Sequence, residues 1–247
     1  MTEPQRTRIA LILGSAPDVV QCASWQRLPG LDIVAINNAW RVRGDWDYLV
    51  APDDFPADRM PTSLAPGQTL ITSADYVPAN NRFGGVFYAG GTMAFSAGYW
   101  ALAALRPRVL AFLGCDMIYA GKGRTHFYGK GQPDPLREDP SLRDLEAKSA
   151  RLMLHALQEG CACVRLSQGD SRLVFPGAEY ADLAEVNVET GSAARTLFDR
   201  AKRLEQRLDY VVPSGRYWDG DFDPDMTLID RLDALWRDAA GAVLGAA

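Results

Sequence analysis

Short, continuous apolar runs recur along the chain, separated by longer segments in which apolar and polar residues mix. Each run is four to six residues long and is bounded by residues that favour turns. Runs of this length are typical of strands buried on both faces, as in a parallel sheet covered by helices. They cover residues 9–13, 32–36, 48–51, 69–72, 86–89, 109–113 and 161–166.

Longer segments have the pattern of helices. Residues 92–105 are apolar on nearly every side and end just before Pro107, which indicates a buried helix. Residues 192–208 have the pattern of a charged amphipathic helix. A last helix is expected from residue 226 to about residue 240.

A further helix is expected over residues 140–159, with Asp139 as its N-cap. The leucines of this segment share one helical face, and His155 falls on the other face with Lys148 and Arg151. We therefore expect His155 to be a solvated surface residue.

Strands that alternate with helices predict an α/β fold. We expect a single Rossmann-like domain with a mostly parallel sheet over residues 1–190, and a C-terminal helical extension over residues 191–247. A short lid at about residues 117–139 is expected after the strand that ends in Gly114–Asp116. The extension is a candidate contact in a homo-oligomer, although no apolar stripe in it requires one.

Composition and charge exclude some classes of protein. The 247 residues are 47% hydrophobic, which is enough for one sizeable core. The formal net charge of −5 argues against a general nucleic-acid binder, because phosphate contacts need clustered Lys and Arg. No apolar run is long enough to span a membrane, so we expect a cytoplasmic protein without an integral membrane segment; peripheral association with a membrane stays open. The four cysteines are expected to be buried, reduced thiols.

In open α/β sheets, ligands bind beyond the carboxyl ends of the strands. The first expected strand runs into Gly14, Ser15, Ala16 and Pro17, a turn whose backbone N–H groups could hold a phosphate. It lacks the further glycines of a dinucleotide-binding turn and the GK[ST] of a P-loop. An ordinary tight turn is the alternative.

Two other segments carry similar candidates. Asn37 and Asn38 follow the second strand, and their amides both donate and accept, which suits a nucleobase or a sugar. Gly90, Gly91 and Thr92 precede the buried helix; the glycines allow the backbone to approach a ligand, and Thr92 is a plausible N-cap. A turn and a helix start are the respective alternatives.

The loop after Asp116 is the richest candidate. Lys122 and Arg124 lie in a glycine-flanked segment that can close over an anionic substrate. His126 is one of two histidines in the chain, titrates near neutral pH and is the best candidate for a general base. Tyr119 and Tyr128 could hydrogen-bond a leaving phosphate. A solvated loop is the alternative for each residue taken alone.

Three aspartates form an alternative metal site. Asp53 and Asp54 follow the third strand, and Asp116, which is also a candidate substrate-binding residue, ends the strand over residues 109–113. Their carboxylates could hold Mg²⁺ through a phosphate-bearing substrate. A solvated loop is the alternative for Asp53 and Asp54.

Together these motifs resemble a known group of proteins. The pattern is G-x-x-P after the first strand, Asn-Asn after the second, Gly-Gly-Thr before an apolar helix, and GCDMIYAGKGRTH from residue 114. Over roughly residues 8–170 the chain resembles the bacterial motility accessory factors, which transfer nonulosonates and share a fold with the archaeal 6-hydroxymethylpterin diphosphokinases. More distantly, it is similar to the bacterial CMP-sialic-acid-dependent sialyltransferases.

The resemblance implies a role for each motif. The turn after the first strand would hold the nucleotide phosphate and ribose, and the two asparagines would contact the cytidine or the sugar. Gly91 and Thr92 would contact the carboxylate of the donor sugar. The two lid tyrosines would stabilise the leaving phosphate, and His126 would deprotonate the acceptor hydroxyl, without a metal. The turn reads GSAPD here and G-N-G-P-S in the sialyltransferases, so Asp18 falls near the expected phosphate.

The function that we expect is an inverting, metal-independent glycosyltransferase without a cofactor. Its partners would be a CMP-linked acidic sugar and a glycan or another acceptor with a hydroxyl group. A diphosphokinase that uses ATP and Mg²⁺ on a pterin-like alcohol is one alternative, with Asp53, Asp54 and Asp116 as metal ligands. A non-catalytic nucleotide-sugar-binding module is another.

Overall fold

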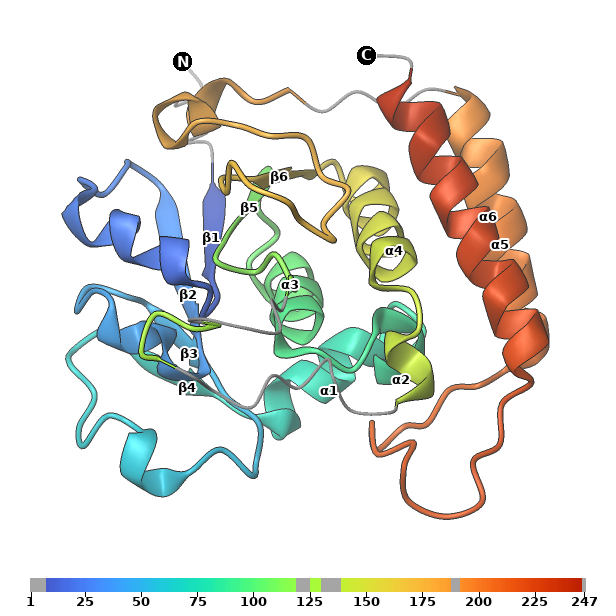
Figure 1. The fold of residues 1–247 in the computed structure, drawn as a ribbon, viewed down its shortest axis with the longest axis horizontal. Coiled ribbons are helices and arrows are strands. Elements are labelled where there is room, and N and C mark those ends of the chain that lie inside the picture. The colour runs from blue at the N-terminus through green and yellow to red at the C-terminus, as the bar shows by residue number, and fades with distance from the viewer. Residues whose placement is uncertain (1–7, 119–124, 130–138, 188–191, 246–247) are drawn as a thin grey trace, which may run out of the picture.

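The computed structural model describes residues 8–118, 125–129, 139–187 and 192–245. Within them the expected Rossmann-like α/β fold is confirmed, because six parallel strands form one sheet with helices packed against it (Figure 1). The strands are β1 (Ile9–Leu13), β2 (Leu31–Ile36), β3 (Tyr48–Val50), β4 (Thr69–Ile71), β5 (Val109–Leu113) and β6 (Ala162–Arg165). The α-helices are α1 (Ser73–Asn81), α2 (Val86–Ala89), α3 (Met93–Ala104), α4 (Leu145–Gln158), α5 (Ser192–Leu208) and α6 (Met226–Leu244).

The strand order is β4-β3-β2-β1-β5-β6, with β1 near the middle of the sheet. The chain moves outward from β1 to β4 and then returns through three helices to β5, on the other side of β1. Ile9 of β1 stands opposite Leu31 of β2 and Val109 of β5. Because all the pairs are parallel, the carboxyl ends of the strands meet at one edge of the sheet.

Successive residues of β1 face opposite sides of the sheet, as the period of a strand requires. Ala10 and Ile12 belong to an apolar cluster that includes residues of α3 and α4. Leu11 belongs to a second cluster on the other face. That face is covered by two 3₁₀ segments, η1 (Pro17–Ser24) and η2 (Asn37–Arg41). Burial on both faces explains why the strands read as continuous apolar runs.

The expected strand over residues 86–89 is wrong, because these residues form helix α2. Gly85 and Gly90 flank it with φ angles of 93° and 91°, in the left-handed region that glycine tolerates best. The four side chains are buried, and the ring of Phe87 packs edge-on against Tyr217 with 5.4 Å between centroids. A four-residue apolar run has no period that separates a buried strand from a buried helical turn.

The expected helix over residues 140–159 is divided. Residues 140–142 form a 3₁₀ turn with Asp139 at its N-cap, and α4 starts at a second N-cap, Asp144. The expectation that His155 lies on the surface is wrong, since this residue is only 6% exposed. Lys148 is buried as well. The polar face of α4 is covered by α5 and α6, which no local pattern in the sequence reveals.

Helices α5 and α6 pack side by side and form an outer layer against α4 (Figure 1). Two buried ion pairs fasten this layer. Arg151 Nε lies 2.5 Å from Glu205 Oε1, and Lys148 Nζ lies 2.8 Å from Asp233 Oδ1. Burial by itself would raise the pKa of Glu205, but the charge of Arg151 and its hydrogen bond hold that pKa below its usual value. Trp236 also donates its indole N–H to Glu205 over 3.1 Å.

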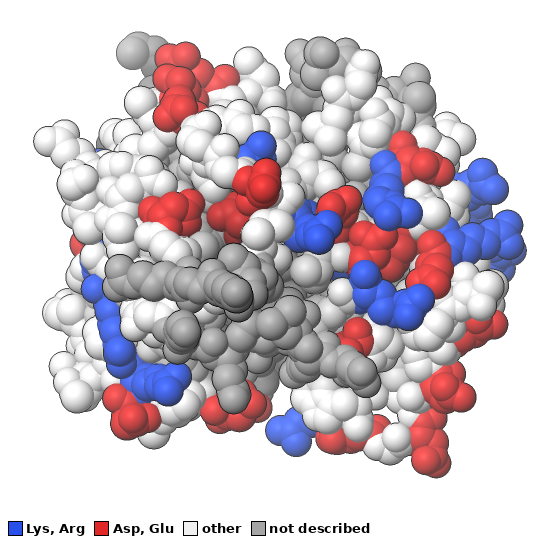
Figure 2. Space-filling view, in the orientation of Figure 1, with Lys and Arg blue, Asp and Glu red and all other residues white. Residues whose placement is uncertain are grey.

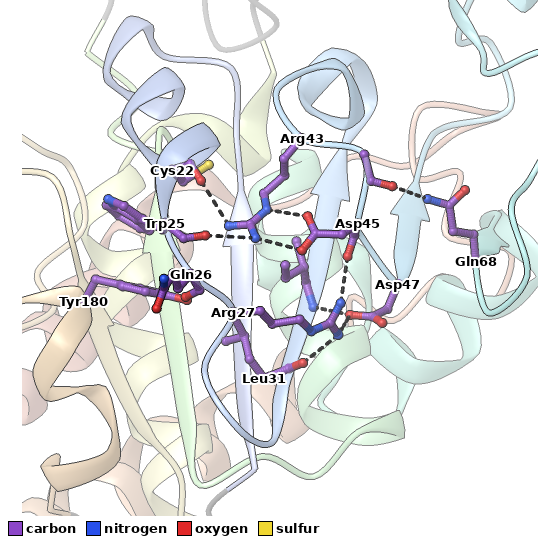
Figure 3. Close-up of polar contacts among 12 residues, drawn as sticks. Cys22, Trp25, Gln26, Arg27, Leu31, Arg43, Asp45, Asp47, Gln68 and Tyr180 are labelled. Atoms are coloured by element: carbon purple, nitrogen blue, oxygen red, sulfur yellow. Dashed lines mark hydrogen bonds and ion pairs between the residues drawn. The ribbon is translucent and has the colours of Figure 1, made fainter.

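At the amino edge of the sheet, two arginines tie neighbouring loops together (Figure 3). Arg43 donates to the carbonyl oxygen of Cys22 over 3.0 Å and to the carboxylate of Asp45 over 2.6 Å. Arg27 donates to the carbonyl oxygen of Asp45 over 2.7 Å and pairs with the carboxylate of Asp47. This edge is opposite the carboxyl ends of the strands, so these charges position the loops that feed β2 and β3.

Charged side chains of both signs gather on the side where α4 and α6 lie (Figure 2). No helix in the described ranges is long and apolar enough to cross a membrane. Burial raises the pKa of every cysteine thiol, and each cysteine is unbonded and buried, as expected: Cys22, Cys115, Cys161 and Cys163.

Candidate functional site

The carboxyl ends of β1 and β5 approach so closely that glycine is required there. A Cβ on Gly14 would lie 2.2 Å from the carbonyl oxygen of Gly114, which no side chain tolerates. The backbone N–H groups of Gly14 and Ala16 donate to the carbonyl oxygens of Leu113 and Gly114 over 2.8 and 3.0 Å. Pro17, the next residue, has no N–H. The N–H groups of Gly14 and Ala16, which were expected to hold a phosphate, are therefore bonded to the protein's own backbone, and Pro17 offers no donor.

A short hairpin brings His126 to this turn. Phe127 donates its backbone N–H to the carbonyl oxygen of Ser15 over 2.9 Å. The Nδ1 atom of His126 lies 2.9 Å from the hydroxyl of Thr125, and its ring centroid lies 5.0 Å from that of Tyr128. His126 is 9% exposed, whereas Tyr128 is 39% exposed. The expected general base is thus held beside the end of β1 with an accessible phenol next to it.

Asn37 and Asn38 lie where β2 runs into η2, on the strand next to β1. Asn37 has a φ of 49°, a conformation that asparagine tolerates better than most residues. The Oδ1 atoms of both side chains are buried and have no hydrogen-bond partner in the described part of the chain. A buried acceptor without a donor is costly. These two oxygens therefore match a ligand that brings N–H or O–H groups.

Gly91 and Thr92, in the turn before α3, are hydrogen-bonded to other residues of the chain. The hydroxyl of Thr92 accepts a hydrogen bond from the N–H of Phe95 over 3.3 Å, so Thr92 caps α3 as expected. The N–H of Gly91 donates to the hydroxyl of Ser141 over 2.9 Å. A Cβ on Gly90 would collide with a side chain of α4. Gly90 is therefore explained by close packing rather than by a ligand.

Two carboxylates, those of Asp18 and Asp116, lie within electrostatic reach of each other beyond the ends of β1, β5 and β6. Asp18 Oδ2 accepts a hydrogen bond from the hydroxyl of Ser167 over 2.7 Å. Burial raises the pKa of Asp116, hydrogen bonds from Ser167 and Ser171 lower it, and the charge of Asp18 raises it again; the net shift is upward. Each aspartate has a buried Oδ1 atom without a hydrogen-bond partner among the described residues. The pair suits a cation or hydroxyl donors.

This pair was not predicted from the sequence. Ser167 directly follows the last expected strand, so the rule that selected the other strand ends could have selected it as well. The sequence places Asp18 only near the expected phosphate. Its carboxylate turns to Ser167, at the end of β6. That approach depends on the pairing of strands far apart in the sequence.

Asp53 and Asp54 do not join Asp116. They are exposed at the end of β3, where Asp53 accepts a hydrogen bond from Ser73 over 2.7 Å and faces Arg216 at 3.7 Å. Three strand spacings separate β3 from β5, or roughly 14 Å. One Mg²⁺ ion holds its ligands at about 2 Å, so it cannot bridge these aspartates. Within the described ranges, no three His, Cys, Asp or Glu side chains are arranged around a metal position.

The remaining candidates lie outside the described residues. They are Tyr119, Lys122 and Arg124, together with most of the expected lid over residues 117–139.

The described part of the edge combines a histidine beside a phenol, two buried amide oxygens and a pair of close carboxylates. Such a set can bind a polar ligand through its donor groups and accept a proton from it. Comparison of the chain with protein-family models, with curated proteins and with solved structures gives no match. The function is therefore argued from these residues and from the motifs that surround them.

Proposed function

We propose that this protein is an inverting, metal-independent glycosyltransferase that moves an acidic, nonulosonic-type sugar from a CMP-sugar donor to an acceptor hydroxyl. The observation that carries the proposal is the position of His126. The bond from the N–H of Phe127 to the carbonyl oxygen of Ser15 holds the hairpin against the turn after β1. A base at this point lies beside the turn to which the family resemblance assigns the donor phosphate.

In the proposed reaction His126 accepts the proton of the acceptor hydroxyl while the hydroxyl oxygen bonds to the anomeric carbon. The bond from that carbon to the phosphate oxygen breaks, and CMP leaves with its electron pair. If Nδ1 of His126 donates to Thr125, Nε2 is the nitrogen that takes the proton. Tyr128, next to the imidazole, is the described phenol that would donate to the leaving phosphate.

The buried asparagine oxygens support a nucleoside as the bound group. Asn37 and Asn38 each present an acceptor without a partner in the described part of the chain. The amino group of cytosine and the ribose hydroxyls are donors that match them. A phosphate alone brings acceptors, so it would leave both oxygens unsatisfied.

Replacement of His126 tests the proposal without knowledge of the acceptor. CMP release from CMP-N-acetylneuraminate, with water as the acceptor, is measured for the natural protein and for His126→Ala. We expect the rate to fall by roughly 10²- to 10⁴-fold, since general-base catalysis contributes about that much, and EDTA to leave both rates unchanged. An unchanged rate in a His126→Ala variant with the same thermal unfolding temperature would refute the mechanism.

A second candidate, the diphosphokinase, is favoured by the pair of Asp18 and Asp116. Their two unpartnered oxygens are the hard donors that Mg²⁺ prefers. In that reaction ATP gives its terminal diphosphate to a pterin alcohol and leaves as AMP. AMP release that requires Mg²⁺ and is lost in Asp116→Asn supports this candidate. A thermal-shift panel of CMP, CDP, UDP, ATP and GTP separates the two functions, and binding without turnover indicates a non-catalytic module.

A further inference from the structure

A cavity of about 390 Å³ opens between the start of α4 and one face of α6. It is lined by five charged side chains, and none of them belongs to the candidate site at the carboxyl edge. Figure 2 shows charges of both signs on this side of the molecule. The lining residues are Arg143, Asp144, Asp230, Asp233 and Arg237.

The walls of this cavity are ion pairs that solvent reaches. Arg143 contacts both oxygens of Asp230, at 2.8 and 3.1 Å, and Arg237 lies 2.7 Å from Asp144. The two arginine side chains are about half exposed, at 49% and 50%. Exposed pairs of this kind contribute little, typically about 0–1 kcal/mol. A charged ligand can therefore exchange partners with them at small cost.

One residue that lines the cavity, Asp233, is buried. Asp233 is 2% exposed, and its Oδ1 atom accepts a hydrogen bond from Lys148 over 2.8 Å. Its Oδ2 atom has no hydrogen-bond partner among the described residues. Burial raises the pKa of Asp233, Lys148 lowers it, and the charges of Asp144 and Asp230 raise it again. An acceptor is thus left without a donor in a place where this is costly.

From this arrangement we infer that the cavity binds a small ligand through a primary ammonium group. Three carboxylates and two guanidinium groups line it, and the unsatisfied position is an acceptor. An ammonium group offers three N–H donors and a positive charge, which suits Asp233 and the wall carboxylates of Asp144 and Asp230. The inference does not depend on the function proposed for the carboxyl edge.

Three four-carbon probes test which charge the ligand carries. Putrescine has an ammonium group at each end, 1,4-butanediol is uncharged, and succinate has two carboxylates. Isothermal titration of the full chain should show binding of putrescine and neither of the others. Binding of succinate in place of putrescine would mean that the guanidinium groups dominate. Equal binding of all three, or no binding of putrescine at about 10 mM, also overturns the inference.

Two variants tie the binding to the cavity. Asp230→Asn removes a wall charge and releases Arg143, so the affinity for putrescine should fall at least about tenfold, as for the loss of a charge-assisted hydrogen bond. Asp238→Asn, an exposed residue of the same helix outside the lining, is the matched control and should bind as the natural protein does.

Asp233→Asn keeps the shape of the deepest group and removes its charge. We expect this variant to lose the response to putrescine, with thermal unfolding as the check that it still folds. If Asp233→Asn does not fold, the comparison of Asp230→Asn with Asp238→Asn decides alone. Folded Asp230→Asn or Asp233→Asn protein that binds putrescine with unchanged affinity would overturn the inference.

Discussion

The imidazole of His155 is packed among four aromatic side chains, those of Phe83, Tyr99, Phe198 and Trp236. Its Nε2 atom is buried and has no hydrogen-bond partner among the described residues. Burial lowers the pKa of His155 well below its usual value, and the positive charges of Arg151 and Lys202 lower it further. The folded protein therefore holds His155 as a neutral ring.

This residue predicts a dependence of stability on pH. His155 titrates near pH 6.5 in the unfolded chain and well below that in the folded protein, so the unfolded chain binds more protons as the pH falls. The contribution of His155 to the free energy of unfolding is present above pH 6.5 and is lost below it, by at most about 1.4 kcal/mol per pH unit. His155→Phe keeps an aromatic ring and should remove this component. Urea unfolding of both proteins between pH 5 and pH 8 measures it, and two parallel profiles would contradict the prediction.

The residues at the carboxyl edge show what sequence can and cannot predict. The sequence predicts Gly14 as a candidate because it follows a strand, and His126 because it is a rare histidine in the loop after another strand. The structure brings both to one turn. The sequence could not reveal that Gly14 is required by the close approach of Gly114, because β5 lies about a hundred residues further along the chain. The same long-range pairing brings Asp18 to Ser167.

Among the elements, α4 shows how long-range pairs reverse a local prediction. The charged face of α4 looks solvated when it is judged by its own sequence. Its Arg151 instead meets Glu205, 54 residues later, and its Lys148 meets Asp233, 85 residues later. Continuous apolar runs predicted every strand of the sheet, and they failed at α2, where the run is too short to show a period. Local pattern thus identifies most elements, and partners distant in sequence decide which of their faces are buried.

Removal of the charge of Glu205 tests how α5 is held. Glu205→Gln leaves Arg151 buried without a counter-charge, and breaking a buried pair in this way typically costs about 3–5 kcal/mol. We expect a loss of free energy of unfolding of that size, measured by denaturant titration. Asp199→Asn, an exposed carboxylate on the same helix, is the control and should change stability by less than about 0.5 kcal/mol. Equal stabilities of the two variants would show that the ion pair is not what fastens α5.

At the scale of the whole molecule, one apolar cluster joins the sheet to the C-terminal helices. It contains Ala10 and Ile12 of β1 as well as Leu204 of α5 and Trp236 of α6. The sequence predicts a C-terminal helical extension from residue 191, and side chains of α5 and α6 pack in the same core as the sheet. Composition alone does not reveal this, because the contacts are made side chain by side chain between distant segments.

A shortened chain tests whether the fold depends on the core that α5 and α6 share with the sheet. A protein that ends at residue 190 would lose Asp233 and Glu205, the carboxylates that pair with Lys148 and Arg151, and would expose the buried face of α4. Each lost partner costs about 3–5 kcal/mol, and the total stability of a domain is only about 5–15 kcal/mol. We expect this chain to lack a cooperative thermal transition and to bind a hydrophobic dye, whereas a chain that ends at residue 245 should unfold as the full chain does. A cooperative transition in the shorter chain would count against the shared core.

The position of β1 between β2 and β5 also has a consequence for the speed of folding. Ile9 pairs with Leu31 early in the chain, but its other partner, Val109, stands one hundred residues further on. Pairings between distant parallel strands raise the contact order and slow the search for the native topology. During synthesis, one edge of β1 stays unpaired until β5 has left the ribosome. Until then, that open edge can pair with strands of other chains, so a chaperone that covers it would protect the growing chain.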